Sequence, residues 1–126
     1  MSDKQTQPAR SEESSPLQVV QAQVDAYNRG DIDAFLNTYA PEVKLYNFPD
    51  ELRSSGLARM REIYSKLFEK APQLHASITN RITQGNYVID QEVITGSPGA
   101  KELTAVAIYE VKDGKIINVW FLRERL

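Results

Sequence analysis

Residues 87–123 read YVIDQEVITGSPGAKELTAVAIYEVKDGKIINVWFLR, and this stretch decides the fold. Apolar side chains recur at alternate positions along three runs, which span residues 87–95, 102–112 and 116–123, as in strands with one buried face. A GSPG segment and a DG pair separate the runs, and residues of these types form tight turns. The stretch therefore predicts three antiparallel strands that follow one another along a sheet.

The preceding residues add a fourth strand to this meander. Apolar and polar side chains alternate again from Leu74 to Ile82, and a QGN turn leads from that run into Tyr87. The meander therefore begins near residue 74.

The segment from residue 15 carries three helix-start signals together. Ser15 can cap a helix, Pro16 suits its first turn, and Gln18 can complete a capping box. Gly30 is expected to end this first helix.

A second, short helix and a third, longer one are expected before the meander. Asp31 can cap the short helix, which should include Tyr39 and end at Pro41. The elements expected after it are a strand over Val43–Phe48, a short strand near Leu52 and Arg53, and a helix over Leu57–Lys70.

The composition is that of one ordinary globular domain. The 126 residues are 41% hydrophobic and 25% charged, which suits a single folded unit. Residues 1–14 are polar without periodicity and predict a flexible tail before a domain over residues 15–126. No apolar run is long enough for a membrane span or a signal peptide, so a cytoplasmic protein is expected.

The same composition excludes several partners and cofactors. The net charge is −2 and the basic residues are scattered, whereas nucleic-acid binding needs clustered positive charge. There is no cysteine and only one histidine, so neither a thiolate site nor a histidine-rich metal site can form. We therefore expect no nucleic acid, no membrane and no cofactor.

Two segments and the order of elements resemble a known superfamily. AYNRGD at residues 26–31 and IYEVKDGKI at residues 108–116 resemble the nuclear transport factor two-like superfamily, which includes SnoaL-like polyketide cyclases, ketosteroid isomerases and limonene epoxide hydrolases. The resemblance covers about residues 16–124. It implies an α+β, cystatin-like cone, in which a curved sheet wraps around the helices and encloses one pocket, often within a homodimer.

The resemblance implies that the catalytic acids of these enzymes are missing here. The position of the isomerase base falls on Asn47, that of its tyrosine donor on Gln23, and that of its acidic donor on Ala107. An amide cannot accept and return a proton as a carboxylate does. The epoxide hydrolase positions fall on Gln91, Val93 and Phe121.

The orientation of the 87–95 strand decides between two functions. The resemblance points Gln91 and Val93 into the pocket, and Asp90 and Glu92 outward to a solvated or interface face. A slip of one residue would reverse this. It would place two carboxyl groups, about 6.5–7 Å apart along the strand, inside the pocket, where they could divide acid and base roles.

The last hairpin sets a second orientation. A two-residue Asp-Gly turn is common, but the resemblance favours a three-residue loop with Gly114 at a bulge position. That loop would place on the pocket face Leu103, Ala105, Ala107 and Tyr109, together with Ile117, Val119, Phe121 and Arg123. The two small alanines would leave room for a ligand, whereas a two-residue turn would send Trp120 into the pocket.

The opposite face of this hairpin predicts an association surface. It would carry Val106, Ile108, Trp120 and Leu122, a patch too apolar to remain exposed to solvent on a monomer. The same surface of a second copy is expected to cover it in a two-fold homodimer.

These observations predict a mostly apolar pocket that binds a small organic molecule. The residues expected to contact it are Gln23, Tyr27, Asn47, Ile63, Gln91, Val93, Ala107, Tyr109, Phe121 and Arg123. Arg123 could bind an anionic group such as a carboxylate. The alternatives are an enzyme of the isomerase, cyclase or dehydratase type that uses Asp90 and Glu92, and a non-catalytic association module whose cone is filled by large side chains.

Overall fold

The computed structural model describes residues 15–99 and 101–123. Its elements are α1 (Pro16–Arg29), α2 (Ile32–Leu36), β2 (Tyr39–Asn47), β3 (Glu51–Ser55), α3 (Leu57–Lys70), β4 (His75–Gln84), β5 (Tyr87–Thr95), β6 (Glu102–Lys112) and β7 (Lys115–Arg123). The tail expected over residues 1–14 and the last three residues of the expected domain lie outside the described residues. No helix within the described ranges is long and apolar enough to cross a bilayer.

The first helix begins and ends where its sequence predicts. The Ser15 N–H donates to Gln18 Oε1 at 2.9 Å and the Gln18 N–H donates to Ser15 Oγ at 3.2 Å, which completes the capping box. Gly30 ends the helix with φ 68°, a left-handed conformation that glycine adopts at little steric cost.

The second helix is shorter than expected, and the strand after it is longer. α2 ends at Leu36, where the Thr38 hydroxyl donates to the Phe35 carbonyl at 2.7 Å. Tyr39 pairs with Ile116 of β7 and therefore belongs to β2. The expectation that the helix runs to Pro41 was wrong, because an irregularity in the pairing between Tyr39 and Lys44 lets a strand contain proline.

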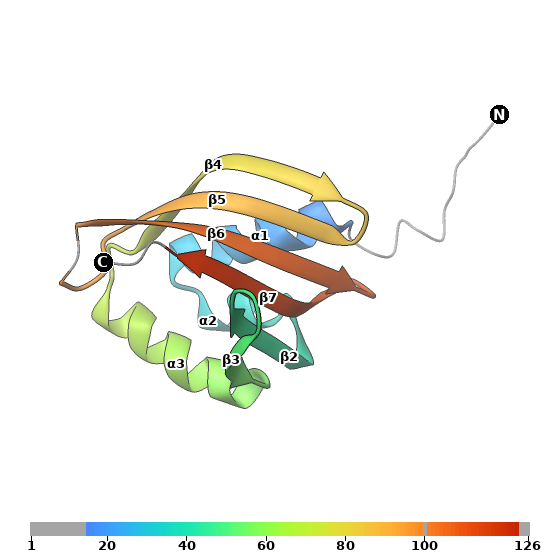
Figure 1. The fold of residues 1–126 in the computed structure, drawn as a ribbon. Helices are drawn as coiled ribbons and strands as arrows, with labels where there is room; N and C mark the ends of the chain where they lie inside the picture. Colours follow the sequence, from blue (N-terminus) through green and yellow to red (C-terminus); the bar gives the residue numbers. More distant parts are fainter. Residues whose placement is uncertain (1–14, 100, 124–126) are drawn as a thin grey trace.

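The six strands form one sheet in the order β3-β2-β7-β6-β5-β4. β2 and β7 pair in parallel, and all other neighbours are antiparallel. The sheet curves, and the helices lie on one side of it (Figure 1). We call the face that packs on the helices the inner face and the opposite one the outer face. This is the predicted α+β cystatin-like architecture.

The core lies between the inner face and the helices. α1 contributes Val20, α3 contributes Met60, and β7 contributes Val119, none of which is exposed. The Phe35 ring of α2 stands at the centre of an aromatic cluster, 4.8 Å from the Tyr64 ring and 5.1 Å from the Tyr39 ring. This cluster joins α2 to α3 and to the sheet, since Tyr64 lies on α3 and Tyr39 on β2.

The orientation predicted for β5 was wrong. Asp90 is fully buried and Glu92 is 7% exposed, whereas Gln91 is exposed on the outer face. The burial pattern of β5 alternates with Val88, Asp90 and Glu92 inward. The expected ligand contacts Gln91 and Val93 therefore point away from the helices, because Arg81 on β4 supplies Asp90 with a partner on the inner face.

The last hairpin reaches the predicted orientation by a different route. Asp113 and Gly114 form a two-residue turn, both with positive φ, and Lys112 pairs with Lys115. The expected three-residue loop is therefore wrong. A bulge follows instead, because Val111 pairs with Ile116 and Glu110 pairs with Asn118, which leaves Ile117 unpaired.

This bulge restores the alternation of faces along β7. Ile116 takes the inner position expected for Ile117, and Val119 lies buried opposite Tyr109. Trp120 pairs with Ile108 on the outer face, as predicted. The two-residue turn does not send Trp120 inward, because the bulge adds the residue that the turn lacks.

Candidate functional site

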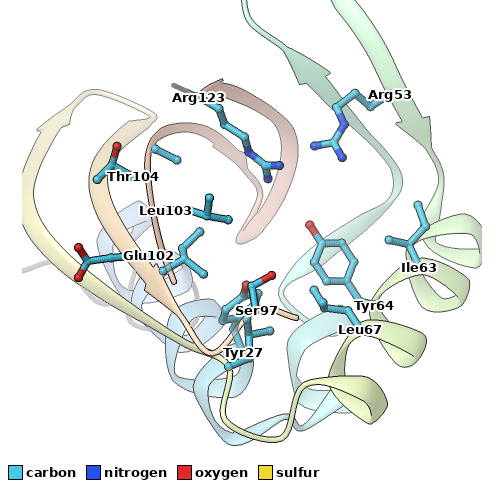
Figure 2. Close-up of a pocket in the computed structure, with 13 residues that line it drawn as sticks. Tyr27, Arg53, Ile63, Tyr64, Leu67, Ser97, Glu102, Leu103, Thr104 and Arg123 are labelled. Carbon is cyan, nitrogen blue, oxygen red and sulfur yellow. The ribbon is translucent and has the colours of Figure 1, made fainter. Parts of the chain in front are cut away.

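A cavity of about 380 Å³ opens between α3 and the inner face, at the end of the sheet where β6 begins and β7 ends. α3 supplies one wall, and Figure 2 shows its Tyr64 side chain pointing into the space. The lining residues are Tyr27, Arg53, Ile63, Tyr64, Leu67, Leu74, Ile94, Ser97, Glu102, Leu103, Thr104, Ala105 and Arg123. Hydrocarbon therefore forms much of the wall, with two arginines and two tyrosines as its main polar groups.

A glutamate, an alanine and an arginine lie side by side on three neighbouring strands of the inner face. Glu92 on β5 pairs with Ala105 on β6, and Ala105 pairs with Arg123 on β7. Neighbouring strands lie about 4.8 Å apart, so the Glu92 and Arg123 backbones are separated by roughly 10 Å. Of the three, Ala105 and Arg123 line the cavity, and Glu92 lies beside that lining on the next strand.

Glu92 is a buried carboxyl group with an altered acidity. Burial, and then the neighbouring Asp90, raises the pKa of Glu92 to about 7, while Arg123 and Arg81 oppose the rise. No side chain within the described ranges donates a hydrogen bond to it. A carboxyl group in these surroundings holds its proton up to neutral pH and can exchange it there.

Asp90 is held as one half of a buried ion pair. Arg81 donates from Nε to Asp90 Oδ1 at 2.5 Å and from Nη2 to Asp90 Oδ2 at 2.8 Å. The remaining Arg81 nitrogen, Nη1, donates to Gln21 Oε1 on α1 at 2.6 Å. Such bidentate pairing fixes the geometry of both groups, so Asp90 is part of the scaffold beneath Glu92.

Two guanidinium groups stand at the mouth of the cavity. Arg53 from β3 and Arg123 from β7 lie over the Phe121 ring, 5.7 and 4.9 Å from its centre. Figure 2 shows the two groups facing each other above the Tyr64 hydroxyl. Such cation–π contacts hold the planar groups in place while their N–H donors remain available.

The two tyrosines of the cavity are neutral hydrogen-bonding groups. Burial raises the pKa of Tyr27 and of Tyr64 above the ordinary value for a phenol. Arg123 and Arg53 oppose the rise at Tyr64, so both guanidinium groups act on its hydroxyl. The Tyr64 ring is held against Phe35 and the Tyr27 ring against Phe68, at 4.8 and 5.6 Å.

Three of the residues expected to contact a ligand line the cavity: Tyr27, Ile63 and Arg123. Phe121 lies beneath the arginines that line it. Ala107 and Tyr109 are on the inner face as predicted, but both belong to the closed core. Gln91 and Val93 lie on the other side of the sheet.

The remaining two expected contacts lie away from the cavity. Gln23 is buried, and its Oε1 atom has no hydrogen-bond partner. Asn47 donates from Nδ2 to Glu51 Oε1 at 2.8 Å, across the β2–β3 turn. Neither side chain contributes to the wall.

The sequence reasoning missed Arg53 and Tyr64 as site residues, and it named Glu92, with Asp90, only for the enzymatic alternative because it pointed both outward. Tyr64 follows Ile63 on the apolar stripe of α3, so its place on the wall could have been inferred from helical spacing. Arg53 lies at a bulge, because Tyr46 pairs with Leu52 and Leu45 pairs with Ser54. A bulge changes the direction in which the extra side chain points, and no feature of the local sequence predicts this bulge.

The site offers no arrangement for a metal ion. Within residues 15–99 and 101–123, no three histidine, aspartate or glutamate side chains gather closely enough to hold one. The ionisable groups that line the described site are a carboxyl, two phenols and two guanidinium groups.

Solved structures resemble the whole domain. An uncharacterised cystatin-fold protein from Novosphingobium aromaticivorans is 28% identical, with a TM-score of 0.80 over 87% of this chain and 99% of that one. A candidate SnoaL-like polyketide cyclase from Jannaschia is 19% identical, with a TM-score of 0.72 over 94% of this chain and 92% of that one. A candidate ketosteroid isomerase from Kribbella flavida is 18% identical, with a TM-score of 0.74 over 88% of this chain and 78% of that one.

The sequence itself identifies the family. No curated protein matches the chain. The profile of the SnoaL-like domain matches residues 20–119, which include all but the ends of the described domain. The chain therefore belongs to the SnoaL-like domain family.

Proposed function

We propose that the protein is an enzyme that binds a small, mostly apolar organic molecule in this cavity and moves a proton on it. Glu92 is the acid–base group. The observation that carries the proposal is the buried Glu92 carboxyl group, with a pKa of about 7, on the inner face beside Ala105. An acid–base group works best when its pKa lies near the working pH.

The neighbouring side chains suit proton transfer next to a carbonyl group. The Glu92 carboxylate would remove a proton from a carbon beside the carbonyl, and the electron pair of the broken C–H bond would move onto the carbonyl oxygen. The Tyr64 or Tyr27 hydroxyl could donate a hydrogen bond to that oxygen. Glu92 would then return the proton to another carbon, so the step needs no co-reactant.

The family supports a reaction of this class without naming the substrate. Two solved structures with this fold are candidates for a polyketide cyclase and a ketosteroid isomerase. Apolar side chains such as Leu67, Leu74 and Leu103 would surround the body of the substrate. A cavity of about 380 Å³ also argues against a pocket-poor association module.

We expect Glu92→Gln to abolish proton transfer. Glutamine keeps the shape of the side chain but cannot accept a proton, and loss of a general base lowers a rate by about 100- to 10,000-fold. The measurement is deuterium uptake from D₂O into a panel of small ketones and enones, followed by NMR. The wild-type rate should rise with pH through about 7, as the Glu92 carboxylate forms.

Glu69→Gln is the matched control, since Glu69 is an exposed acid on α3, away from the cavity lining. It should exchange at the wild-type rate. If compounds bind but the wild type catalyses no uptake above the control buffer, the protein is a binding protein and the enzymatic proposal fails. Equal rates in wild type and Glu92→Gln would exclude Glu92 as the base.

We also propose that two copies associate through the outer face. Leu122 is 47% exposed there, beside half-buried Val106, Ile108 and Trp120. The Trp120 ring stacks on Tyr46 at 5.7 Å, which extends the apolar surface to β2. Such a continuous patch favours a two-fold sheet-on-sheet interface.

Leu122→Asp should convert a dimer into a monomer, because it would bury a charge in that interface. Sedimentation velocity measures the change. Leu17→Asp is the control, since Leu17 is 42% exposed on α1, outside the patch, and it should leave the dimer intact. A monomeric wild type would refute the association.

A further inference from the structure

The arginines of the described chain divide into two groups. Four of them pair with a carboxylate within 4.0 Å, and these pairs are Arg29–Asp31, Arg59–Glu62, Arg61–Asp33 and Arg81–Asp90. Arg53 and Arg123 have no acidic partner within residues 15–99 and 101–123. These two are also the arginines that line the cavity.

The two unpaired guanidinium groups converge on one place. Both stand over the Phe121 ring, and both act electrostatically on the Tyr64 hydroxyl. Figure 2 shows them facing each other across the cavity mouth, while Glu102, the acid on the rim, points away from both. Since the three groups come from β3, β7 and α3, the fold itself brings these donors together.

We infer that the substrate carries a carboxylate group, which Arg53 and Arg123 bind at the mouth of the cavity with the Tyr64 hydroxyl as a third donor. The inference rests on the proposed function, since it concerns the substrate of the same cavity. Guanidinium groups present paired N–H donors that match the two oxygens of a carboxylate. The apolar wall beyond them would hold the uncharged remainder of the molecule.

A carboxylate suits the site better than a phosphate. Two guanidinium groups are available, and Glu92 lies in the row that contains Arg123. With Glu92 ionised, one ligand carboxylate brings the summed charge of the two guanidinium groups and Glu92 to zero, whereas a dianionic phosphate would leave one negative charge in excess. In that row Ala105 separates Glu92 from Arg123. The substrate carbon that gives its proton to Glu92 would therefore lie only a few bonds from the substrate carboxylate that Arg123 binds.

The test is a binding experiment that does not depend on catalysis. A series of phenylalkanoates, from benzoate to 4-phenylbutanoate, is titrated into the protein beside the matching amides, with phenyl phosphate as a further ligand. We expect at least one acid to bind about tenfold or more tightly than its amide, as hydrogen bonds to charged groups require. The Arg53 and Arg123 side-chain N–H signals in NMR should shift with that acid.

Arg53→Gln and Arg123→Gln should each reduce the preference for acid over amide, and the double variant should remove it. Arg59→Gln, which removes an equal charge from an exposed pair on α3, should keep it. Equal binding of every acid and its amide, or an unchanged preference in the double variant, would overturn the inference. Tighter binding of phenyl phosphate than of every carboxylate would also overturn it.

Two readouts separate this inference from the proposed function. If the acids bind through the arginines but the wild type moves no proton, only the enzymatic proposal fails. If neutral ketones exchange protons through Glu92 while Arg53 and Arg123 do not increase the affinity for the acids, only the carboxylate inference fails.

Discussion

Arg81→Met should be among the most destabilising single substitutions in the chain, lowering the free energy of unfolding by about 3–5 kcal/mol. Methionine fills most of the space of the arginine stem but cannot pair with a carboxylate. Asp90, which is fully buried, would lose both of its hydrogen bonds from Arg81. Urea denaturation of the two proteins measures the loss.

Arg61→Met provides the comparison, because Arg61 also pairs with an aspartate at 3.0 Å, but its side chain is 55% exposed and that of Asp33 is 81% exposed. Exposed pairs contribute about 0–1 kcal/mol. We also expect the double variant Arg81→Met/Asp90→Asn to recover part of the loss, since it no longer buries an unpaired charge. Similar losses for Arg81→Met and Arg61→Met would contradict the role assigned to burial.

Glu92→Gln should stabilise the protein at alkaline pH and have much less effect in acid. The folded protein holds the Glu92 proton up to pH about 7, whereas the ordinary pKa is 4.5. The folded state therefore binds more protons than the unfolded chain between these values, so stability falls as pH rises through this window. The shift corresponds to about 3 kcal/mol at pH above 7, by the energy of one pKa unit.

Unfolding free energies of wild type and variant, measured from pH 4 to pH 9, check this expectation. The difference between the two should grow from a small value at low pH to about 3 kcal/mol in favour of the variant. Glu69→Gln, at an exposed site, should give a nearly constant difference. A difference between Glu92→Gln and wild type that does not change with pH would mean that Glu92 titrates normally in the folded state.

A loss of activity together with a gain in stability would identify Glu92 as a residue kept for function rather than for folding. Residues that are selected for chemistry commonly reduce stability. Arg81 is expected to behave in the opposite way, as a residue whose removal weakens the whole domain. The two inward-facing acids of β5 therefore have different tasks despite lying two residues apart.

The sequence predicts the elements well because local chemistry fixes their ends. The capping box at Ser15 and the left-handed Gly30 set the limits of α1. The expected helix over Leu57–Lys70 matches α3 in full, since its apolar stripe has a clear helical period. The bulges at Arg53 and Ile117 were not predictable, because they depend on how two strands pair.

The orientation of β5 was not decided by its own residues. Val88 and Ile94 point to one face and Ile89 and Val93 to the other, so hydrophobic alternation favours neither. The preceding strand gave no better signal, because its alternation from Leu74 to Ile82 places Arg81 on the polar face, whereas an irregularity between Ile78 and Asn80 turns Arg81 inward. If the Gly85-Asn86 turn has two residues, it pairs Gln84 with Tyr87 and therefore places Arg81 opposite Asp90, as the structure does.

The position of β7 in the middle of the sheet has a consequence for biosynthesis. β7 is the last strand of the domain to leave the ribosome, yet it joins β2 on one side to β6 on the other. Until it emerges, no strand pairing joins β2 and β3 to the β4–β6 meander. The nascent domain therefore completes its fold only after translation has passed residue 123.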